Sequence, residues 1–252
     1  METKLIHFSN KPLSATIIAA FTSLVAVFPL PVKAITFITD RTALKSNDQV
    51  DWSSLGAANP FNFLPNSFSA KSERGLGLSV DIPKLNLPGL TPPFVFQTLP
   101  SPGIATNFAK GDFVLFGGLI LGSFPAPGNP GPITINFDKP VKSVGTQIAV
   151  DDTLEFTASI SAFDNANNLL GTFSAPGTSS LALDNSALFL GVLSDTPNIS
   201  RLVFSTSVAN RGLAINTLSI AAVPEPTFIC GLLVFGVLGG SLIKKDKTNK
   251  TV

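Results

Sequence analysis

The second half of the sequence alternates apolar and polar residues with a period of two. From Ile133 to Phe137 an isoleucine or phenylalanine occupies every second position, and the segment from Phe156 to Ala162 alternates in the same way with threonine and serine. Successive side chains of a β-strand point to opposite faces, so each segment has one apolar face and one polar face. The pattern predicts half-buried strands.

Turn-forming residues separate these strands from others. Turns are predicted at Asp138–Pro140, at 164–168 and at Asp195–Asn198, because Asp, Asn and Pro favour turn backbone. Further strands are predicted at Val141–Val150, Leu169–Ser174, Leu188–Leu193, Ile199–Ser205 and Leu213–Ile220. At least six antiparallel strands therefore fill this half, and two packed sheets bury their apolar faces best.

The first half is less regular. Asp40–Leu44 predicts a short helix, the proline-rich stretch from Leu85 to Pro102 predicts a long surface loop, and the apolar run Gly111–Leu121 predicts a core strand. No stretch shows a long helical period, so this half is expected to complete the same sheets. The fold class predicted for residues 35–222 is all-β, an antiparallel β-sandwich that is jelly-roll-like.

An apolar segment precedes this domain. It is uncharged from Pro12 to Val32 and follows a basic start, and Val32 and Ala34 are small or modest residues at the positions that a signal peptidase reads. We expect residues 1–34 to be a signal peptide cut between Ala34 and Ile35. The alternative is an uncleaved membrane-spanning helix, since about 20 apolar residues can cross a bilayer.

A second apolar segment ends the chain. Pro224, Glu225 and Pro226 precede the uncharged residues 227–243, and a basic stop of Lys244, Lys245 and Lys247 follows. Residues 227–243 predict a single C-terminal transmembrane helix, and the positive-inside rule keeps the lysines in the cytoplasm. Together with the signal peptide, this orientation predicts an exported domain held at the cell membrane.

The order of these three elements resembles the PEP-CTERM sorting signal, which the membrane enzyme exosortase reads. The resemblance covers 223–252. It implies exosortase as a partner, transient anchoring, cleavage near the Pro-Glu-Pro triplet, and release to the cell surface or extracellular matrix, where exopolysaccharide is a further partner. A plain single-pass anchor is the alternative.

Composition excludes several kinds of chemistry from the exported domain. Between Ile35 and Val223 there are ten Lys and Arg against thirteen Asp and Glu, a net charge of −3 without a basic stripe, so nucleic acid is not an expected partner. The only histidine is His7 and the only cysteine is Cys230, both outside this range. Ser-His-Asp and Cys-His mechanisms, zinc sites with His or Cys ligands, and disulfides are therefore excluded there. No cofactor is predicted.

Carboxylates are the remaining candidates for chemistry. Asp138, Asp151, Asp152, Glu155 and Asp164 are the densest group. A glycosidase requires two carboxylates that face each other across its substrate, whereas adjacent Asp151 and Asp152 point to opposite faces of a strand. Asp151, Asp152 and Asp164 are also weak candidates for a calcium site, for which solvated turns are the simpler interpretation.

Carbohydrate binding requires an aromatic platform. The chain has no tyrosine and one tryptophan, Trp52, which follows Asp51 and is a weak candidate for stacking on a sugar ring. Packing inside the domain is the alternative role for Trp52. Most of the 21 phenylalanines occupy alternating positions and are expected in the core.

The domain also resembles ectodomains that accompany this sorting signal. The resemblance rests on the opening Phe37–Arg41, the mid-chain strand Ile133–Gly145 and the closing strand Leu213–Ile220. Such relatives commonly carry aspartate where this chain has Asn216, which leaves a carboxylate role there in doubt. The resemblance implies architecture rather than activity.

The leading functional hypothesis is a non-catalytic structural or adhesin-like surface protein associated with exopolysaccharide. Two alternatives stay open: a secreted polysaccharide-modifying enzyme that uses carboxylates, and a calcium- or carbohydrate-binding module. The leading hypothesis agrees with the two predicted export signals and with a domain that has no recognisable catalytic motif.

Cleavage after Ala34 is directly testable. We expect N-terminal sequencing of the exported protein to begin at Ile35, because signal peptidase selects small residues at the positions before the cut. Exported protein that still begins at Met1 would contradict the signal-peptide assignment.

Overall fold

The computed structural model describes residues 35–122, 125–151 and 154–223. The predicted signal peptide and residues 224–252 of the predicted sorting tail lie outside these ranges. Among the described residues the helical elements are two 3-10 turns, η1 (Arg41–Leu44) and η2 (Trp52–Leu55), and none is long and apolar enough to cross a membrane.

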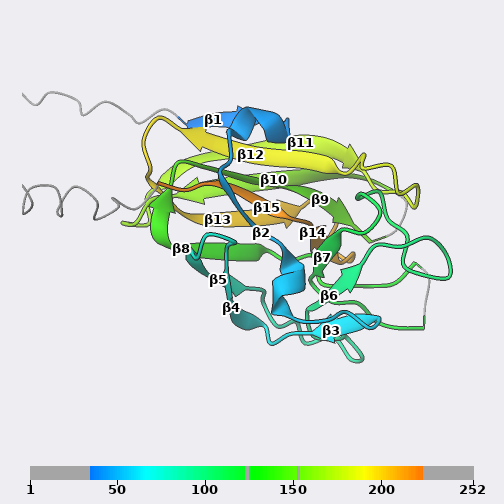
Figure 1. Cartoon of the computed structure of the whole chain (residues 1–252). Helices are drawn as coiled ribbons and strands as arrows, with labels where there is room; N and C mark the ends of the chain where they lie inside the picture. Colours follow the sequence, from blue (N-terminus) through cyan, green and yellow to red (C-terminus); the bar gives the residue numbers. More distant parts are fainter. Residues whose placement is uncertain (1–34, 123–124, 152–153, 224–252) are drawn as a thin grey trace, which may run out of the picture. The chain divides into compact units, whose positions relative to one another are not determined.

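Within the described ranges, fifteen strands form two antiparallel sheets (Figure 1). The nine-stranded sheet contains β1 (Ile35–Ile38), β2 (Asp48–Val50), β3 (Phe61–Phe63), β6 (Phe94–Gln97), β7 (Phe113–Phe116), β9 (Ser143–Val150), β12 (Leu188–Ser194), β14 (Leu213–Ile215) and β15 (Leu218–Ala221). The six-stranded sheet contains β4 (Ser67–Lys71), β5 (Gly77–Asp81), β8 (Ile133–Val141), β10 (Glu155–Phe163), β11 (Leu169–Thr178) and β13 (Ile199–Thr206). The prediction of an all-β antiparallel sandwich is confirmed.

The strand order explains how the chain builds two layers. Neighbours in one sheet run β12-β9-β14-β7, and neighbours in the other run β11-β10-β13-β8. The chain therefore passes repeatedly from one sheet to the other between β7 and β14, which is the arrangement of a jelly roll. Strands β1 to β6 extend the two sheets at their edges, so the first half joins the sandwich as predicted.

The core between the sheets follows from the two-residue period. In β10 the buried residues are Phe156, Ala158, Ile160 and Ala162, and their hydroxyl-bearing neighbours are less buried. They belong to one apolar cluster with Leu190 and Val192 of β12 and with residues of β8, β9 and β13. The predicted turn at 164–168 is also present, and it pairs β10 with β11 as a hairpin.

Two predictions for particular segments are wrong. Asp138–Pro140 does not turn the chain: β8 continues to Val141, and these three residues are its exposed part, opposite an irregularity in the pairing with β13. The proline-rich segment from Leu85 to Pro102 is not entirely a surface loop, because it contains the buried strand β6. Its prolines flank the strand, where no ladder hydrogen bond is lost.

Both ends of the described sandwich lie at one end of the nine-stranded sheet, at the left of Figure 1. Ile35 pairs with Ser194, whose backbone N–H donates to the carbonyl of Lys142 at 2.9 Å. The N–H of Lys142 in turn donates to the carbonyl of Ala221 at 2.9 Å. The opposite end of the sheet is where β9 reaches Val150 and pairs with Leu213 at the start of β14.

A buried polar network surrounds Asn216, at the break between β14 and β15. Asn216 is 3% exposed, and its Oδ1 accepts from Arg41 Nη2 at 3.0 Å and from the N–H of Gln147 at 3.0 Å. Its Nδ2 donates to Asp112 Oδ2 at 2.8 Å and to Gln147 Oε1 at 2.7 Å. Its backbone carbonyl accepts from Trp52 Nε1 at 2.8 Å. The break in the strand is therefore fully hydrogen-bonded inside the protein.

Arg41 links this network to the beginning of the domain. Nη1 donates to the Thr217 carbonyl at 3.0 Å and to Ser219 Oγ at 2.6 Å, and the guanidinium lies 5.1 Å from the ring centre of Phe189. Burial lowers the pKa of Arg41, and the charge of Asp112 opposes that shift. The single turn η1 is thus fixed on the nine-stranded sheet by one charged side chain.

The network predicts that Asn216→Asp destabilises the protein. The new carboxylate would lose the donor that now contacts Asp112 at 2.8 Å and would place two negative charges together. We expect a loss of about 1–3 kcal/mol in the free energy of unfolding of the full chain at pH 7. Arg41, whose Nη2 lies 3.0 Å from Asn216 Oδ1, offsets part of the repulsion between the two carboxylates but cannot replace the lost donor.

The double variant Asn216→Asp with Asp112→Asn should recover most of the loss, because an amide then donates to the carboxylate. The exposed change Asn86→Asp is the matched control and should leave stability nearly unchanged. Equal stability of Asn216→Asp and the wild type at pH 7 would show that the network does not require an amide at this position.

Candidate functional site

A second apolar cluster lies on the outer face of the nine-stranded sheet. In β6, Val95 belongs to the core between the sheets, whereas Phe94 and Phe96 belong to the second cluster. In β7, Leu115 likewise belongs to the core between the sheets, and Phe116 belongs to the second cluster. The sequences of these strands are continuous apolar runs because both faces of each strand are buried.

Two segments, residues 98–110 and 179–187, cover this outer face. They join each other through the N–H of Leu183, which donates to the Thr106 carbonyl at 2.7 Å, and the N–H of Ala187, which donates to the Asn107 carbonyl at 3.0 Å. The side-chain Nδ2 of Asn107 donates to the Thr178 carbonyl at 2.8 Å. Residues 98–110 and 179–187 therefore form a fixed cover rather than two independent loops.

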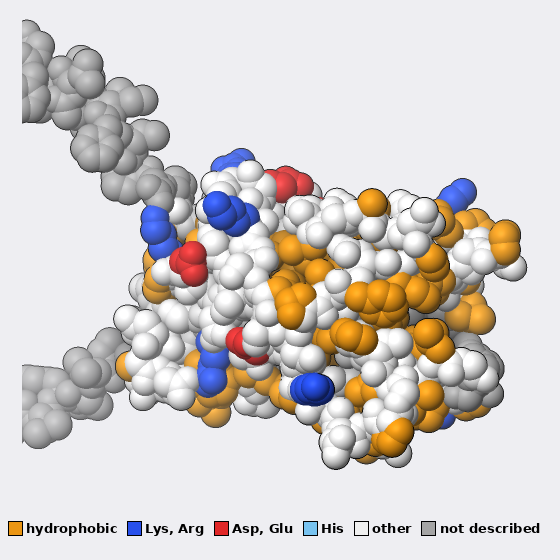
Figure 2. Space-filling model, turned by 90° about the horizontal axis from the view of Figure 1, so that it is seen from below, with side chains coloured by type: hydrophobic (Ala, Val, Ile, Leu, Met, Phe, Trp, Pro, Cys, Tyr) orange, Lys and Arg blue, Asp and Glu red, His pale blue; other side chains and the backbone are white. Residues whose placement is uncertain are grey.

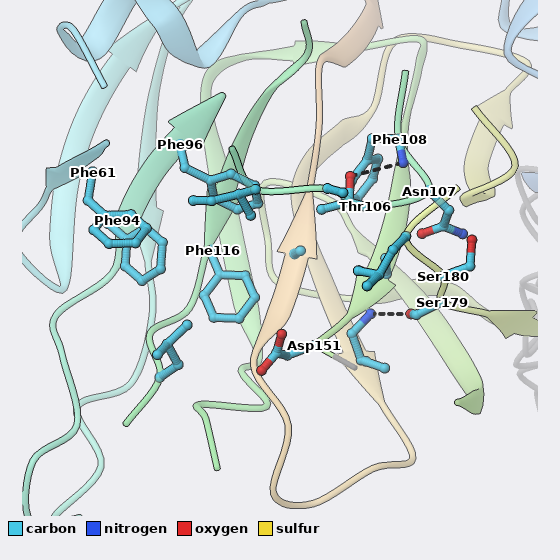
Figure 3. A pocket seen from close by; sticks show the side chains of 17 residues that line it. Phe61, Phe94, Phe96, Thr106, Asn107, Phe108, Phe116, Asp151, Ser179 and Ser180 are labelled. Carbon is cyan, nitrogen blue, oxygen red and sulfur yellow. Dashed lines mark hydrogen bonds between the residues drawn. The ribbon is translucent and has the colours of Figure 1, made fainter. Parts of the chain in front are cut away.

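A cavity of about 220 Å³ lies between the sheet and this cover. Figure 3 shows Phe61, Phe94, Phe96 and Phe116 on one side of it. The ring centres of Phe61 and Phe94 are 4.7 Å apart, and those of Phe94 and Phe116 are 5.2 Å apart. The rings support one another and form a rigid aromatic wall.

The polar groups of the cavity lie on the opposite side, next to Phe108. Asn107, Ser179 and Ser180 lie there, and Asp151 lies at the end of β9 (Figure 3). Leu181 also lines the cavity and is 56% exposed, so the cavity opens to solvent beside it. A concave, mainly apolar site with a few polar groups is the usual form of a small-molecule pocket. We refer to it as the phenylalanine pocket.

The phenylalanine pocket lies at the end of the sheet that is opposite to Ile35 and Ala221. Val150, Asp151 and Ala214 line it, and they are at the far end of β9 and in the adjacent β14. Figure 2 shows the molecule from below: on this face most charged side chains lie toward the left, and apolar side chains gather in the centre and right.

The predicted carboxylate candidates do not come together. Asp151 lines the phenylalanine pocket, but Asp164 lies in the hairpin turn between β10 and β11, where its Oδ1 accepts from the N–H groups of Ala166 and Asn168 at 2.9 and 2.8 Å. Glu155 begins β10 and Asp164 follows its end, so these two lie at opposite ends of a nine-residue strand. Asp152 lies outside the described residues.

Within the described ranges no group of three His, Cys, Asp or Glu side chains is arranged to hold a metal ion. The role of Asp164 is that of a turn residue.

Trp52 is not a surface platform. Its side chain is 0% exposed and belongs to the core cluster, with its Nε1 bonded to Asn216. The packing alternative is the one that the structure supports. The aromatic wall comes instead from phenylalanines, which sequence reasoning assigned to the core as a class. The signal that distinguishes them is the unbroken run Phe94–Phe96, which is too apolar for a strand with one solvent face.

Comparison with known proteins gives distant similarities. No protein-family model and no curated protein matches the sequence. Among solved structures, a DUF4465 family protein from Bacteroides caccae is 13% identical with a TM-score of 0.35, over 75% of this chain and 100% of that chain. The enzymatically active domain of tailspike protein 4 from Bacteriophage CBA120 is 15% identical with a TM-score of 0.25, over 68% of this chain and 20% of that chain.

A family 11 carbohydrate-binding module from Clostridium thermocellum is 9% identical with a TM-score of 0.15, over 71% of this chain and 97% of that chain. Similarities at this level carry no argument about function.

The placement of the carboxylates predicts that stability does not depend on a metal. We expect the thermal midpoint of the full chain to be unchanged by a chelator such as EDTA, because the packing of the two sheets suffices for a domain of this size. A fall of several degrees on chelation, reversed by calcium, would restore the calcium hypothesis.

Proposed function

We propose that this protein is an exported, exosortase-sorted surface protein. Its β-sandwich would be a non-catalytic binding module that faces away from the membrane, within the exopolysaccharide layer. One observation carries the proposal: the two ends of the sandwich lie together at one end of the nine-stranded sheet, and the phenylalanine pocket lies at the other.

The orientation follows from the tail. Val223, the last described residue, directly precedes Pro224, Glu225 and Pro226. An anchor formed by 227–243 would hold the end with Ala221 close to the bilayer. The eight residues of β9 then separate this end from the phenylalanine pocket, a length of about 26 Å at about 3.3 Å per residue. The pocket would be presented to the outside.

A binding role fits the pocket better than hydrolysis of a glycosidic bond. Asp151 is the single carboxylate among the described residues that line it, whereas glycoside hydrolysis ordinarily uses two carboxylates on either side of the bond. A polysaccharide-modifying enzyme would therefore need a second acid from elsewhere in the chain. An adhesin-like module requires only a fixed, exposed recognition surface.

Glu225→Ala tests the sorting part of the proposal. Glu225 is the only charge between Ala221 and Ile243, and the flanking prolines exclude the triplet from a regular helix by removing backbone donors. We expect export to be intact and processing of the tail to be lost, as measured by mobility and membrane association in a host with exosortase. A plain anchor would tolerate the change.

The matched control is Glu155→Ala, which removes an exposed carboxylate from the sandwich. It should be processed like the wild type. Unchanged processing of Glu225→Ala would refute the sorting role of the triplet.

A further inference from the structure

The phenylalanine pocket contains a buried acceptor that the protein leaves unpaired. Asn107 is 1% exposed, and its Nδ2 is bonded to the Thr178 carbonyl, but its Oδ1 has no partner. In the view of Figure 3 this oxygen is on the side of the amide that faces Phe116. An unpaired buried acceptor is costly, and native proteins tolerate few of them.

The hydroxyl oxygens near Asn107 already accept hydrogen bonds from the backbone. Ser179 Oγ accepts from the N–H of Val150 at 3.0 Å, and Ser180 Oγ accepts from the N–H of Ala182 at 3.3 Å. Thr106 Oγ1 is 2.9 Å from Thr98 Oγ1 and accepts from the N–H of Phe108 at 3.2 Å. These bonds hold the cover in place, and Asn107 Oδ1 is a buried acceptor among the pocket's lining residues that has no partner within the described protein.

We infer that the phenylalanine pocket binds a small, mainly apolar molecule that carries one hydroxyl or N–H donor. Its apolar part packs against Phe94, Phe96 and Phe116, and its donor bonds to Asn107 Oδ1. This ligand would bind in the pocket that, in the proposed function, faces away from the membrane. The inference does not depend on processing of the tail, so the two can fail separately.

Size and polarity define the ligand class. Apolar cavities of about 150 Å³ in other proteins take up benzene, so 220 Å³ suits one or two fused rings. A hexose would bring about five hydroxyl groups against the aromatic wall, and each hydroxyl left unpaired there costs free energy. The pocket therefore favours an apolar ring with one donor over a sugar.

The test uses phenol and indole, which have one donor, against benzene and glucose. Binding to the full chain is followed by amide NMR titration in a detergent, with correction for uptake of each probe by the micelles. We expect phenol and indole to bind about fivefold or more tightly than benzene, which corresponds to one hydrogen bond. Glucose should not bind in the pocket.

Three variants assign the effect to the pocket. Asn107→Leu should remove the preference for phenol over benzene. Ala149→Leu fills the pocket from β9 while keeping Asn107, and it should weaken all apolar probes at least tenfold. Leu169→Ala, at the exposed hairpin end of β11, is the matched control and should bind like the wild type.

Several results would overturn the inference. They are the absence of saturable binding of phenol and indole, equal affinity for phenol and benzene, tighter binding of glucose, and unchanged binding to Ala149→Leu. If Asn107→Leu does not fold, two measurements still test the inference. They are the relative affinity of the wild type for phenol and benzene, and the loss of binding in Ala149→Leu.

Discussion

The hydrogen bonds of Asn216 are the constraint on which the rest of the sandwich depends. The last strand of the nine-stranded sheet is interrupted at this residue, between β14 and β15. A break inside a sheet leaves backbone groups that no neighbouring strand can satisfy. Arg41 and Trp52 donate to the carbonyls of Thr217 and Asn216, and the carbonyl of Gln147 accepts from the N–H of Asn216. The two 3-10 turns are thereby fixed to the sheet, because each contributes one of these side chains.

This arrangement allows the nine-stranded sheet to use both of its faces. At one end, η1 covers the outer face. The hydroxyl of Ser143, at the start of β9, donates to the carbonyl of Leu44, at the end of η1, at 2.7 Å. At the other end, the segments 98–110 and 179–187 cover it incompletely and leave the phenylalanine pocket. The sandwich therefore has one end where the chain enters and leaves, and another end with an aromatic recess suited to a ligand.

How far the sequence predicts this structure depends on the range of the interactions. The hairpin of β10 and β11 was predicted because its alternation and its turn residues are local. The bond from Arg41 to Asn216 joins residues 175 positions apart, and no local pattern indicates it. The pocket was missed for the same reason: the phenylalanines of β6 resemble core residues until the cover from 179–187 is placed.

In the proposed arrangement, the phenylalanine pocket faces away from the membrane while the tail still anchors the protein. Leu181 and Val223 mark the two ends and are similarly exposed, at 56% and 53%. Each can be replaced by cysteine in a Cys230→Ser background, labelled with a donor dye, and measured for energy transfer to a headgroup acceptor in membranes from a host without exosortase. We expect strong transfer from position 223 and weak transfer from position 181. Equal transfer from both positions would contradict it.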